Sequence, residues 1–144
     1  FAHSQWDGLE EQYGMEFAAP IHNLPSDKGF FDYYSSILMP VLSNRRWFSD
    51  AHNFMLQSFT GFGDEKEKNV ICYSNRFENN TVYVVVNYQD SEINGKISTS
   101  VDNWPAIGSI QNLAQSYNTM IEDSPFKKIR LGPWGFCIFI VTGK

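Results

Sequence analysis

Residues 69–88, NVICYSNRFENNTVYVVVNY, contain two runs of β-branched and aromatic residues. Residues of these types fit a pleated, half-buried surface and are enriched in strands. The polar group Glu78, Asn79 and Asn80 separates the two runs. The composition of this stretch therefore predicts a β-hairpin with its turn at residues 78–80.

The sequence after this hairpin predicts further short strands. INGKISTSV (93–101) contains Asn94-Gly95, a pair that favours a tight hairpin turn, followed by an alternating strand. Residues 110–117 fit either a short helix or a strand, and FKKIRL (126–131) alternates. GPWG (132–135) favours a turn, and FCIFIV (136–141) fits a strand buried on both faces. Several short strands separated by turns favour an antiparallel β-sandwich or barrel over a parallel sheet.

The N-terminal half differs, because its apolar residues from Leu24 to Phe48 have helical spacing. Ser26 is a suitable N-cap, and an apolar stripe extends from Phe30 to Leu42. Pro40 is expected to kink or split this helix, because proline lacks the backbone donor and clashes with the preceding turn. Arg45 and Arg46 suit the negative pole of the helix dipole.

GFGDEKEK, residues 61–68, marks the clearest boundary in the chain. Two glycines and a run of alternating charges cannot bury themselves, so we expect a solvated connector. The predicted organisation is a loop and helix segment at residues 1–60, the connector at 61–68, and a β-sandwich domain at 69–144.

Composition limits the classes of partner. The chain has 144 residues, a formal net charge of -5 and a pI near 5.1, which disfavours nucleic acid and anionic membranes. No apolar run approaches the roughly twenty residues of a transmembrane helix. Cys72 and Cys137 lie in apolar runs, so we expect two buried free thiols, with a disulfide between the first and last strands as the alternative. Aromatic content is high, and aromatic rings provide flat faces for sugars.

The order of these segments resembles the C-terminal portion of an alpha-amylase superfamily (glycoside hydrolase family 13-like) enzyme. FAHSQWDGLEEQYGME (1–16) is similar to the segment after the last barrel strand, and FFDYYSSILMPVLSNRRWF (30–48) to the last barrel helix. VICYSNRFENNTVYVVVNYQDSEINGKISTSV (70–101) and IRLGPWGFCIFIV (129–141) resemble the first strands and closing hairpin of the family's Greek-key β-sandwich. These motifs cover most of the chain, and each is short.

The resemblance implies that the chain is the C-terminal part of a longer alpha-glucan-active glycosidase. The family's nucleophile aspartate, acid/base glutamate and stabilising aspartate lie on barrel strands that would precede Phe1. We therefore expect no complete catalytic site in this chain, no cofactor and no metal site. The expected partners are the catalytic barrel of the parent chain and an oligosaccharide or polysaccharide. Self-association through the apolar helix face is a further expectation.

Several residues are candidates for carbohydrate contact. By position in the resemblance, His3, Gln5, Trp6 and Glu10 would lie near substrate, because catalytic faces are built from loops at strand C-termini. Trp104 and Trp134 lie in turn-like stretches beside Pro105 and Pro133, where an exposed ring can stack on a sugar, although packing between sheets is the commoner fate of tryptophan.

The carboxylates of residues 7–16 are poor candidates for catalysis, because nothing in the sequence provides a rigid frame to hold a pair of them at the required spacing. His3 and Asp7 are too few to form a metal site.

Two other readings of the function remain open at this point. The chain can be a self-contained carbohydrate-binding or protein-interaction module in which residues 1–60 cap the sandwich. A small hydrolase that uses the carboxylates of residues 7–16 is the third reading.

Overall fold

The computed structural model describes residues 28–49, 54–62, 67–98 and 107–143. The chain forms two compact units, residues 1–42 and 43–144. The described part of the first unit is helical, whereas the second unit contains all of the described strands. None of the helices in the described ranges is long and apolar enough to span a bilayer.

The predicted helix is present but irregular. Helix α2 (Lys28–Tyr33), the π-helical segment η1 (Tyr34–Leu38) and helix α3 (Met39–Ser43) follow one another. The N–H of Met39 donates to the carbonyl of Tyr34, five residues earlier. This wider turn directly precedes Pro40, whose ring cannot fit over a regular α-helical turn. The expected disruption at Pro40 is therefore a π-helical turn, and the expected N-cap Ser26 lies outside the described residues.

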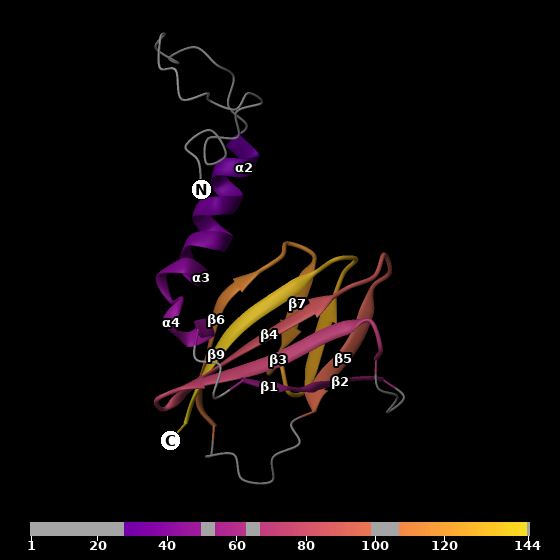
Figure 1. The fold of residues 1–144 in the computed structure, drawn as a ribbon. Helices are drawn as coiled ribbons and strands as arrows, with labels where there is room; N and C mark the ends of the chain where they lie inside the picture. Colours follow the sequence, from indigo (N-terminus) through magenta and orange to yellow (C-terminus); the bar gives the residue numbers. More distant parts are fainter. Residues whose placement is uncertain (1–27, 50–53, 63–66, 99–106, 144) are drawn as a thin grey trace. The chain divides into compact units, whose positions relative to one another are not determined.

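The second unit is a sandwich of two antiparallel sheets (Figure 1). The five-stranded sheet has the order β1 (Phe54–Leu56), β3 (Val70–Phe77), β4 (Asn80–Asn87), β9 (Phe136–Gly143) and β6 (Ile107–Gln115). The four-stranded sheet has the order β2 (Ser58–Gly61), β5 (Ile93–Ser98), β8 (Lys128–Leu131) and β7 (Thr119–Glu122). The antiparallel sandwich predicted from the sequence is confirmed.

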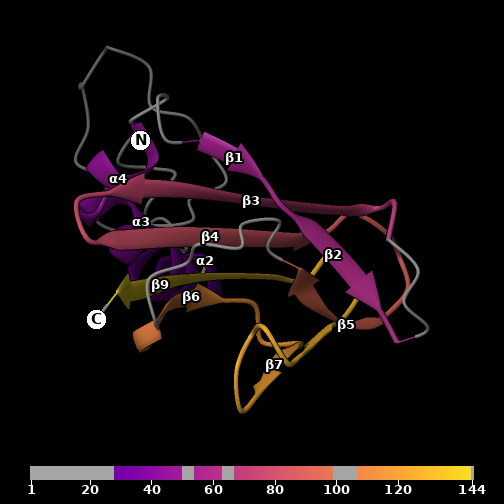
Figure 2. The same cartoon turned by 90° about the horizontal axis from the view of Figure 1, so that it is seen from below.

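Strands β1 and β2 connect the two sheets at one edge. Only Gln57 separates them, and Figure 2 shows the chain passing from the first sheet to the second at this point. The Gln57 N–H donates to the Cys72 carbonyl at 2.9 Å, and its side-chain Nε2 donates to Ser74 Oγ at 2.8 Å. Both strands precede residue 69, where the sequence placed the start of the sandwich. The domain limits drawn from the sequence stay a prediction.

The β3–β4 hairpin agrees with the sequence prediction. Phe77 pairs with Asn80, so Glu78 and Asn79 form the turn, and Glu78 has a φ of 56°. The short helix α4 (Arg46–Ser49) contacts β3 and β4 close to this turn. The Arg46 guanidinium lies 5.6 Å from the centre of the Phe77 ring.

Aromatic rings are the largest side chains in the core between the sheets. Tyr83 of β4 stacks on Phe139 of β9 with ring centres 5.1 Å apart and an interplanar angle of 10°. Phe126 meets Tyr83 edge-on at 5.3 Å. The opposite face of β9 is also buried at Ile140, as expected for the continuous apolar run of residues 136–141. Such rings each bury a large apolar area and contribute more to stability than their number suggests.

The two cysteines are buried free thiols, as expected. Cys72 of β3 pairs with Val85 of β4, and Val85 pairs in turn with Cys137 of β9. The thiols therefore lie on one face of the sheet with a whole strand between them. Two strand spacings place their Cα atoms roughly 9–10 Å apart, beyond the ~7 Å that a disulfide tolerates. The disulfide alternative is wrong for this fold.

The turn predicted at Asn94-Gly95 is also wrong. Both residues lie inside β5, where Asn94 pairs with Arg130 and Gly95 pairs with Ile129 and, on the other side, Gly61. A Cβ at Gly95 would collide with the backbone carbonyl of Thr60 and come within 2.5 Å of the Phe59 ring. Glycine is needed here for the close approach of β2, and not for a turn.

The undecided stretch at residues 110–117 is mainly strand. It belongs to β6, which pairs with β9 through two register irregularities, between Ile107 and Ser109 and between Asn112 and Ala114. Bulges of this kind break the alternation of side chains along a strand. These irregularities explain why a strand at residues 107–115 lacks a clear alternation of polar and apolar residues.

Candidate functional site

The turn between β8 and β9 presents an exposed tryptophan. The Gly135 N–H donates to the Gly132 carbonyl at 2.9 Å, which closes a four-residue turn with Pro133 and Trp134 at its centre. Trp134 has a φ of 54° and is 58% exposed. Proline followed by a residue with positive φ is the pattern of a type II turn, in which the second position usually holds glycine. A bulky residue at such a φ is an outlier.

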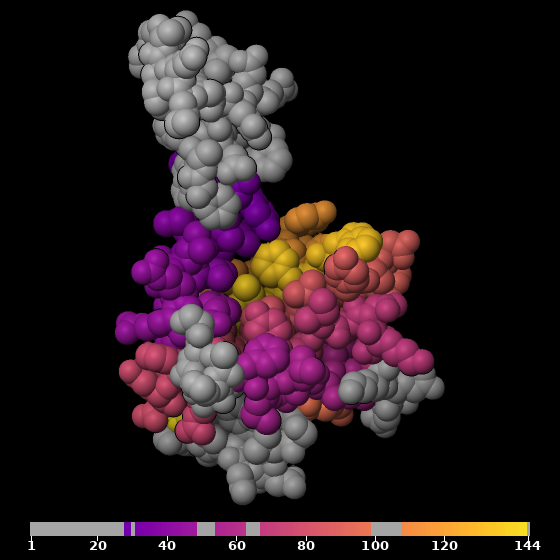
Figure 3. All heavy atoms as spheres, in the orientation of Figure 1, coloured from indigo at the N-terminus to yellow at the C-terminus, as the bar shows by residue number. Residues whose placement is uncertain are grey.

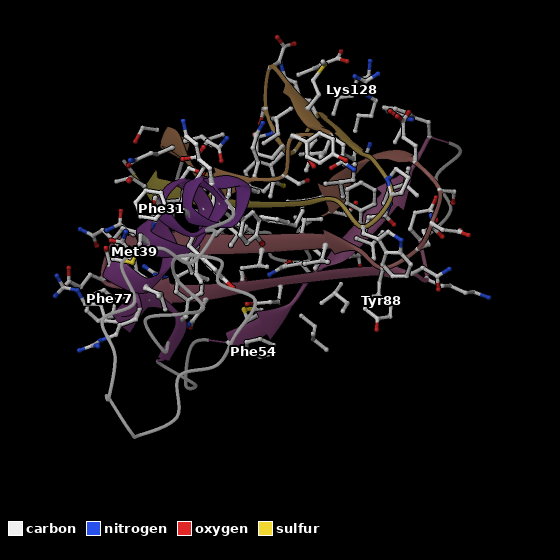
Figure 4. All side chains as sticks on the ribbon, turned by 90° about the horizontal axis from the view of Figure 1, so that it is seen from above. Phe31, Met39, Phe54, Phe77, Tyr88 and Lys128 are labelled. Carbon is white, nitrogen blue, oxygen red and sulfur yellow. The ribbon has the colours of Figure 1, made fainter. Side chains whose placement is uncertain are left out.

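The end of β4 brings a second ring beside Trp134. The Asn87 N–H donates to the Gly135 carbonyl at 2.8 Å, and the Trp134 N–H donates to the Gln89 carbonyl at 3.0 Å. These bonds place the Tyr88 ring edge-to-face against Trp134, with centres 5.4 Å apart and an interplanar angle of 85°. Tyr88 is 65% exposed, and Figure 4 shows it at the opposite end of the β3–β4 hairpin from Phe77, with its ring directed away from the sheet.

The fully buried side chain of Asn87 holds the segments that carry these rings. Its Nδ2 donates to the carbonyls of Ser91 at 2.7 Å, Gly132 at 2.8 Å and Leu131 at 3.4 Å. Asn118 supports the turn from the other side, because its Nδ2 donates to the Pro133 carbonyl at 2.9 Å. Side-chain hydrogen bonds from Asn87 and Asn118 therefore stabilise the backbone segments that carry Tyr88 and Trp134.

Two amide side chains extend the polar surface next to the rings. Asn69 Nδ2 donates to Gln89 Oε1 at 3.1 Å, and the Tyr88 N–H donates to the Asn69 carbonyl at 2.8 Å. Each amide group has two N–H donors and an oxygen acceptor, so this bond leaves further donor and acceptor capacity on both. Exposed rings beside amides can contact the C–H face of a sugar and hydrogen bond its hydroxyl groups. We call Tyr88, Trp134, Asn69 and Gln89 the aromatic platform.

Of the six residues that the sequence analysis named as candidates for carbohydrate contact, the structure describes one, Trp134. Trp134 is exposed and belongs to the aromatic platform, whereas His3, Gln5, Trp6, Glu10 and Trp104 lie outside the described residues. The sequence did not identify the other platform residues. Tyr88 ends the VVVNY run, which is a weak signal by itself, and only the pairing of β4 with β9 shows that it meets Trp134.

The buried ionisable groups do not resemble a reaction centre. Burial raises the pKa of both the Cys72 and the Cys137 thiol to about 12, and for Cys137 the neighbouring Cys72 adds to the effect. Burial also raises the pKa of the Tyr83 hydroxyl. Thiols with raised pKa values in an apolar core are inert as nucleophiles. Within the described ranges, no three His, Cys, Asp or Glu residues are grouped closely enough to hold a metal ion.

No protein-family model matches the sequence, and no curated protein matches it. Solved structures do match. The trehalose-6-phosphate hydrolase TreA of Bacillus licheniformis is 14% identical, and the match has a TM-score of 0.54 and covers 78% of this chain and 18% of that enzyme. At this level of identity the match shows the fold alone, and the predicted resemblance is confirmed to that extent.

Two further enzymes are similar with the same coverage. They are the isomaltulose synthase of Erwinia rhapontici NX5, at 15% identity and a TM-score of 0.47, and the trehalulose synthase MutB of Pseudomonas mesoacidophila MX-45, at 17% and 0.46. The chain spans about a fifth of the length of the alpha-amylase superfamily structures that it matches, since each match covers 18% of the enzyme.

Proposed function

We propose that this chain is the C-terminal segment of an alpha-glucan-active glycosidase, a hydrolase or transglycosidase, in which the β-sandwich supports a catalytic barrel. The observation that carries this proposal is the fold match to a trehalose-6-phosphate hydrolase, which covers 78% of this chain and 18% of the enzyme. In the family, the catalytic carboxylates belong to the barrel. The role of this segment is then structural, with carbohydrate contact as an additional role.

The exposed residues at the edge of the five-stranded sheet support the proposal that another part of a larger protein covers this edge. Phe54, Met55 and Leu56 of β1 are all exposed, and Ile71 of the neighbouring strand is exposed as well. Figure 3 shows the β1–β2 segment, in magenta, at the surface of the sandwich. By strand alternation Phe54, Leu56 and Ile71 share one face, and exposed apolar residues at a strand edge are typical of an interface, because an uncovered edge invites aggregation. The barrel of the parent chain is the proposed cover for this edge.

The helical unit has a similar feature. Phe31, Tyr33, Met39 and Leu42 are large apolar residues that remain exposed. In a glycosidase the apolar side chains of this helical segment would pack on the barrel as its last helix. Self-association through the apolar stripe of residues 30–42 is the outcome that we propose for the chain when it is separated from a barrel.

The test is to sequence the native polypeptide and to compare one substitution in two contexts. Leu56 is 74% exposed in this chain, so Leu56→Lys is expected to be neutral in residues 1–144. In the native polypeptide the same substitution is expected to lower the thermal midpoint, because it would bury a charge against the barrel. Tyr117→Lys, at a residue that is 100% exposed, is the matched control and should be neutral in both.

Two results would contradict the proposal. One is a native polypeptide with no barrel sequence before residue 1. The other is an equal, negligible effect of Leu56→Lys in both contexts.

A self-contained carbohydrate-binding module is the second candidate, and the exposed Tyr88–Trp134 pair favours it. The native sequence separates the two candidates, because only the glycosidase proposal requires a barrel upstream. Sugar binding by itself is compatible with both.

A further inference from the structure

We propose that the aromatic platform is an α-glucan-contact site and that Trp134 is kept in its turn for binding, at a cost to folding. The site would lie on the sandwich itself, in addition to any site in a catalytic barrel. The choice of α-glucan as ligand rests on the proposed function, whereas the existence of a sugar site rests on the geometry of the platform.

The backbone of Trp134 provides the first argument. Its φ of 54° lies in the left-handed region, where a bulky side chain is unfavourable and where this type of turn favours glycine. The strain has little compensation in burial, because the residue is 58% exposed and its ring contacts that of Tyr88, which is itself exposed. Strained residues that do not contribute to the core are concentrated at functional sites. Glycine would fold better at this position, so a role in stability does not account for the tryptophan.

The arrangement of the rings provides the second argument. The rings of Tyr88 and Trp134 are nearly perpendicular, with an interplanar angle of 85° and centres 5.4 Å apart. A pyranose ring has C–H faces that pack on aromatic rings, and hydroxyl groups around its rim. The amides of Asn69 and Gln89 provide donors and acceptors for such hydroxyl groups beside the rings.

The rigidity of the platform provides the third argument. Asn87 and Asn118 hold the 132–135 turn by side-chain hydrogen bonds to its backbone, and the Trp134 N–H is bonded to the Gln89 carbonyl. The backbone that carries the rings is therefore held in place before a ligand arrives. Preorganised aromatic groups lose little conformational entropy on binding, which favours affinity from a small contact area.

The charge near the platform favours a neutral ligand. Asp90 and Glu92 are exposed in the segment that follows Gln89, and the whole chain has a formal net charge of -5. Stacking surfaces for single-stranded nucleic acids combine aromatic rings with a positively charged groove. The exposed cation Lys68 precedes Asn69 in the sequence, and together with these two carboxylates it does not make the positively charged groove that a phosphate backbone requires, whereas an uncharged glucan needs no such groove.

The experiment is a calorimetric titration of the full 144-residue chain with maltoheptaose, with cellohexaose as the comparison sugar, combined with thermal unfolding of each variant. We expect millimolar or tighter binding of maltoheptaose. Trp134→Gly and Tyr88→Ala should each weaken it at least tenfold. Trp134→Gly should leave the thermal midpoint unchanged or raise it by roughly 3 °C, because glycine relieves the backbone strain.

Two control variants separate the site from general effects. Glu78→Gly relieves a φ of 56° at the β3–β4 turn, where no platform residue lies, and should leave affinity unchanged. Tyr117→Ala removes a fully exposed ring outside the platform and should also leave affinity unchanged.

Any one of three results overturns the proposal. Maltoheptaose shows no binding at about 10 mM, ten times the expected dissociation constant, or cellohexaose binds and maltoheptaose does not. The third result is a fall of more than about 5 °C in the thermal midpoint of Trp134→Gly. None of these results bears on whether a barrel precedes the chain, so failure of this site and failure of the glycosidase proposal are distinguishable.

Discussion

Replacing the buried Asn87 with alanine tests how the platform is held. The side chain is fully buried, and its Nδ2 donates to the carbonyls of Ser91 and Gly132 at 2.7 and 2.8 Å and, more weakly, to that of Leu131 at 3.4 Å. Alanine removes this donor from the part-buried carbonyl of Ser91 and from the buried carbonyl of Gly132, which keeps the Gly135 N–H. Each strong bond contributes about 1 kcal/mol net.

We therefore expect Asn87→Ala to lower the free energy of unfolding by roughly 1–3 kcal/mol. For a chain of this size, that loss corresponds to a fall of roughly 3–10 °C in the thermal midpoint. Thermal unfolding followed by circular dichroism, together with urea denaturation, measures both quantities. Affinity for maltoheptaose should fall as well in the folded variant, because the segments carrying Tyr88 and Trp134 lose a common support.

Asn94→Ala is the matched control for Asn87→Ala. Asn94 Nδ2 donates to Glu92 Oε1 at 3.2 Å in an exposed position, so its loss should change the free energy of unfolding by less than about 0.5 kcal/mol. The reasoning about Asn87 would be refuted by equal effects of the two substitutions on the free energy of unfolding.

Three further substitutions or conditions follow from the sandwich. Gly95→Ala should lower the free energy of unfolding, measured by urea denaturation, by about 1–3 kcal/mol, because the Cβ of the alanine would collide with the backbone of β2. Phe139→Ala should lower it by roughly 3–5 kcal/mol, since the ring lies fully buried against its aromatic neighbours. Burial raises the pKa of Cys72 and Cys137 from 9.0 to about 12, so unfolded thiols lose protons in a pH range in which the native thiols keep theirs. The free energy of unfolding should therefore fall as pH rises from about 9 towards 12, which urea midpoints across this range measure.

Each of these expectations has its own comparison. Phe62→Ala, at an exposed phenylalanine, should be near neutral beside Phe139→Ala. The double variant Cys72→Ala/Cys137→Ala should show a shallower fall of stability with pH, and a slope equal to that of the unmodified chain would contradict the assignment to the thiols. If Gly95→Ala leaves the urea midpoint unchanged, β2 can move away from β5 at little cost in free energy.

Local sequence patterns predicted most of the elements. The β3–β4 hairpin was predicted because β-branched residues, aromatic residues and a polar turn lie next to one another in the sequence. The buried strand β9 was predicted because residues 136–141 are apolar on both faces. The disruption at Pro40 followed from the covalent structure of proline, although its form as a π-helical turn did not.

The errors arose where distant segments meet. Asn94-Gly95 has the composition of a hairpin turn, but Gly95 is needed because β2 approaches β5 closely, and β2 lies more than thirty residues earlier in the chain. The disulfide alternative failed because β4 lies between Cys72 and Cys137. Trp134 was a candidate from its turn alone, whereas Tyr88 became one only through the pairing of β4 with β9.

The sequence by itself determined that residues 70–141 contain antiparallel strands and that the chain resembles the C-terminal part of alpha-amylase superfamily enzymes. The first conclusion depends on periodicity, which is a local property of the chain, and the second on a resemblance in the order and motifs of the segments along the sequence. Only the tertiary structure decided which strands are neighbours, which residues pair across them and which rings share a surface. Register joins residues that are far apart in sequence, and local preferences carry no information about such pairs.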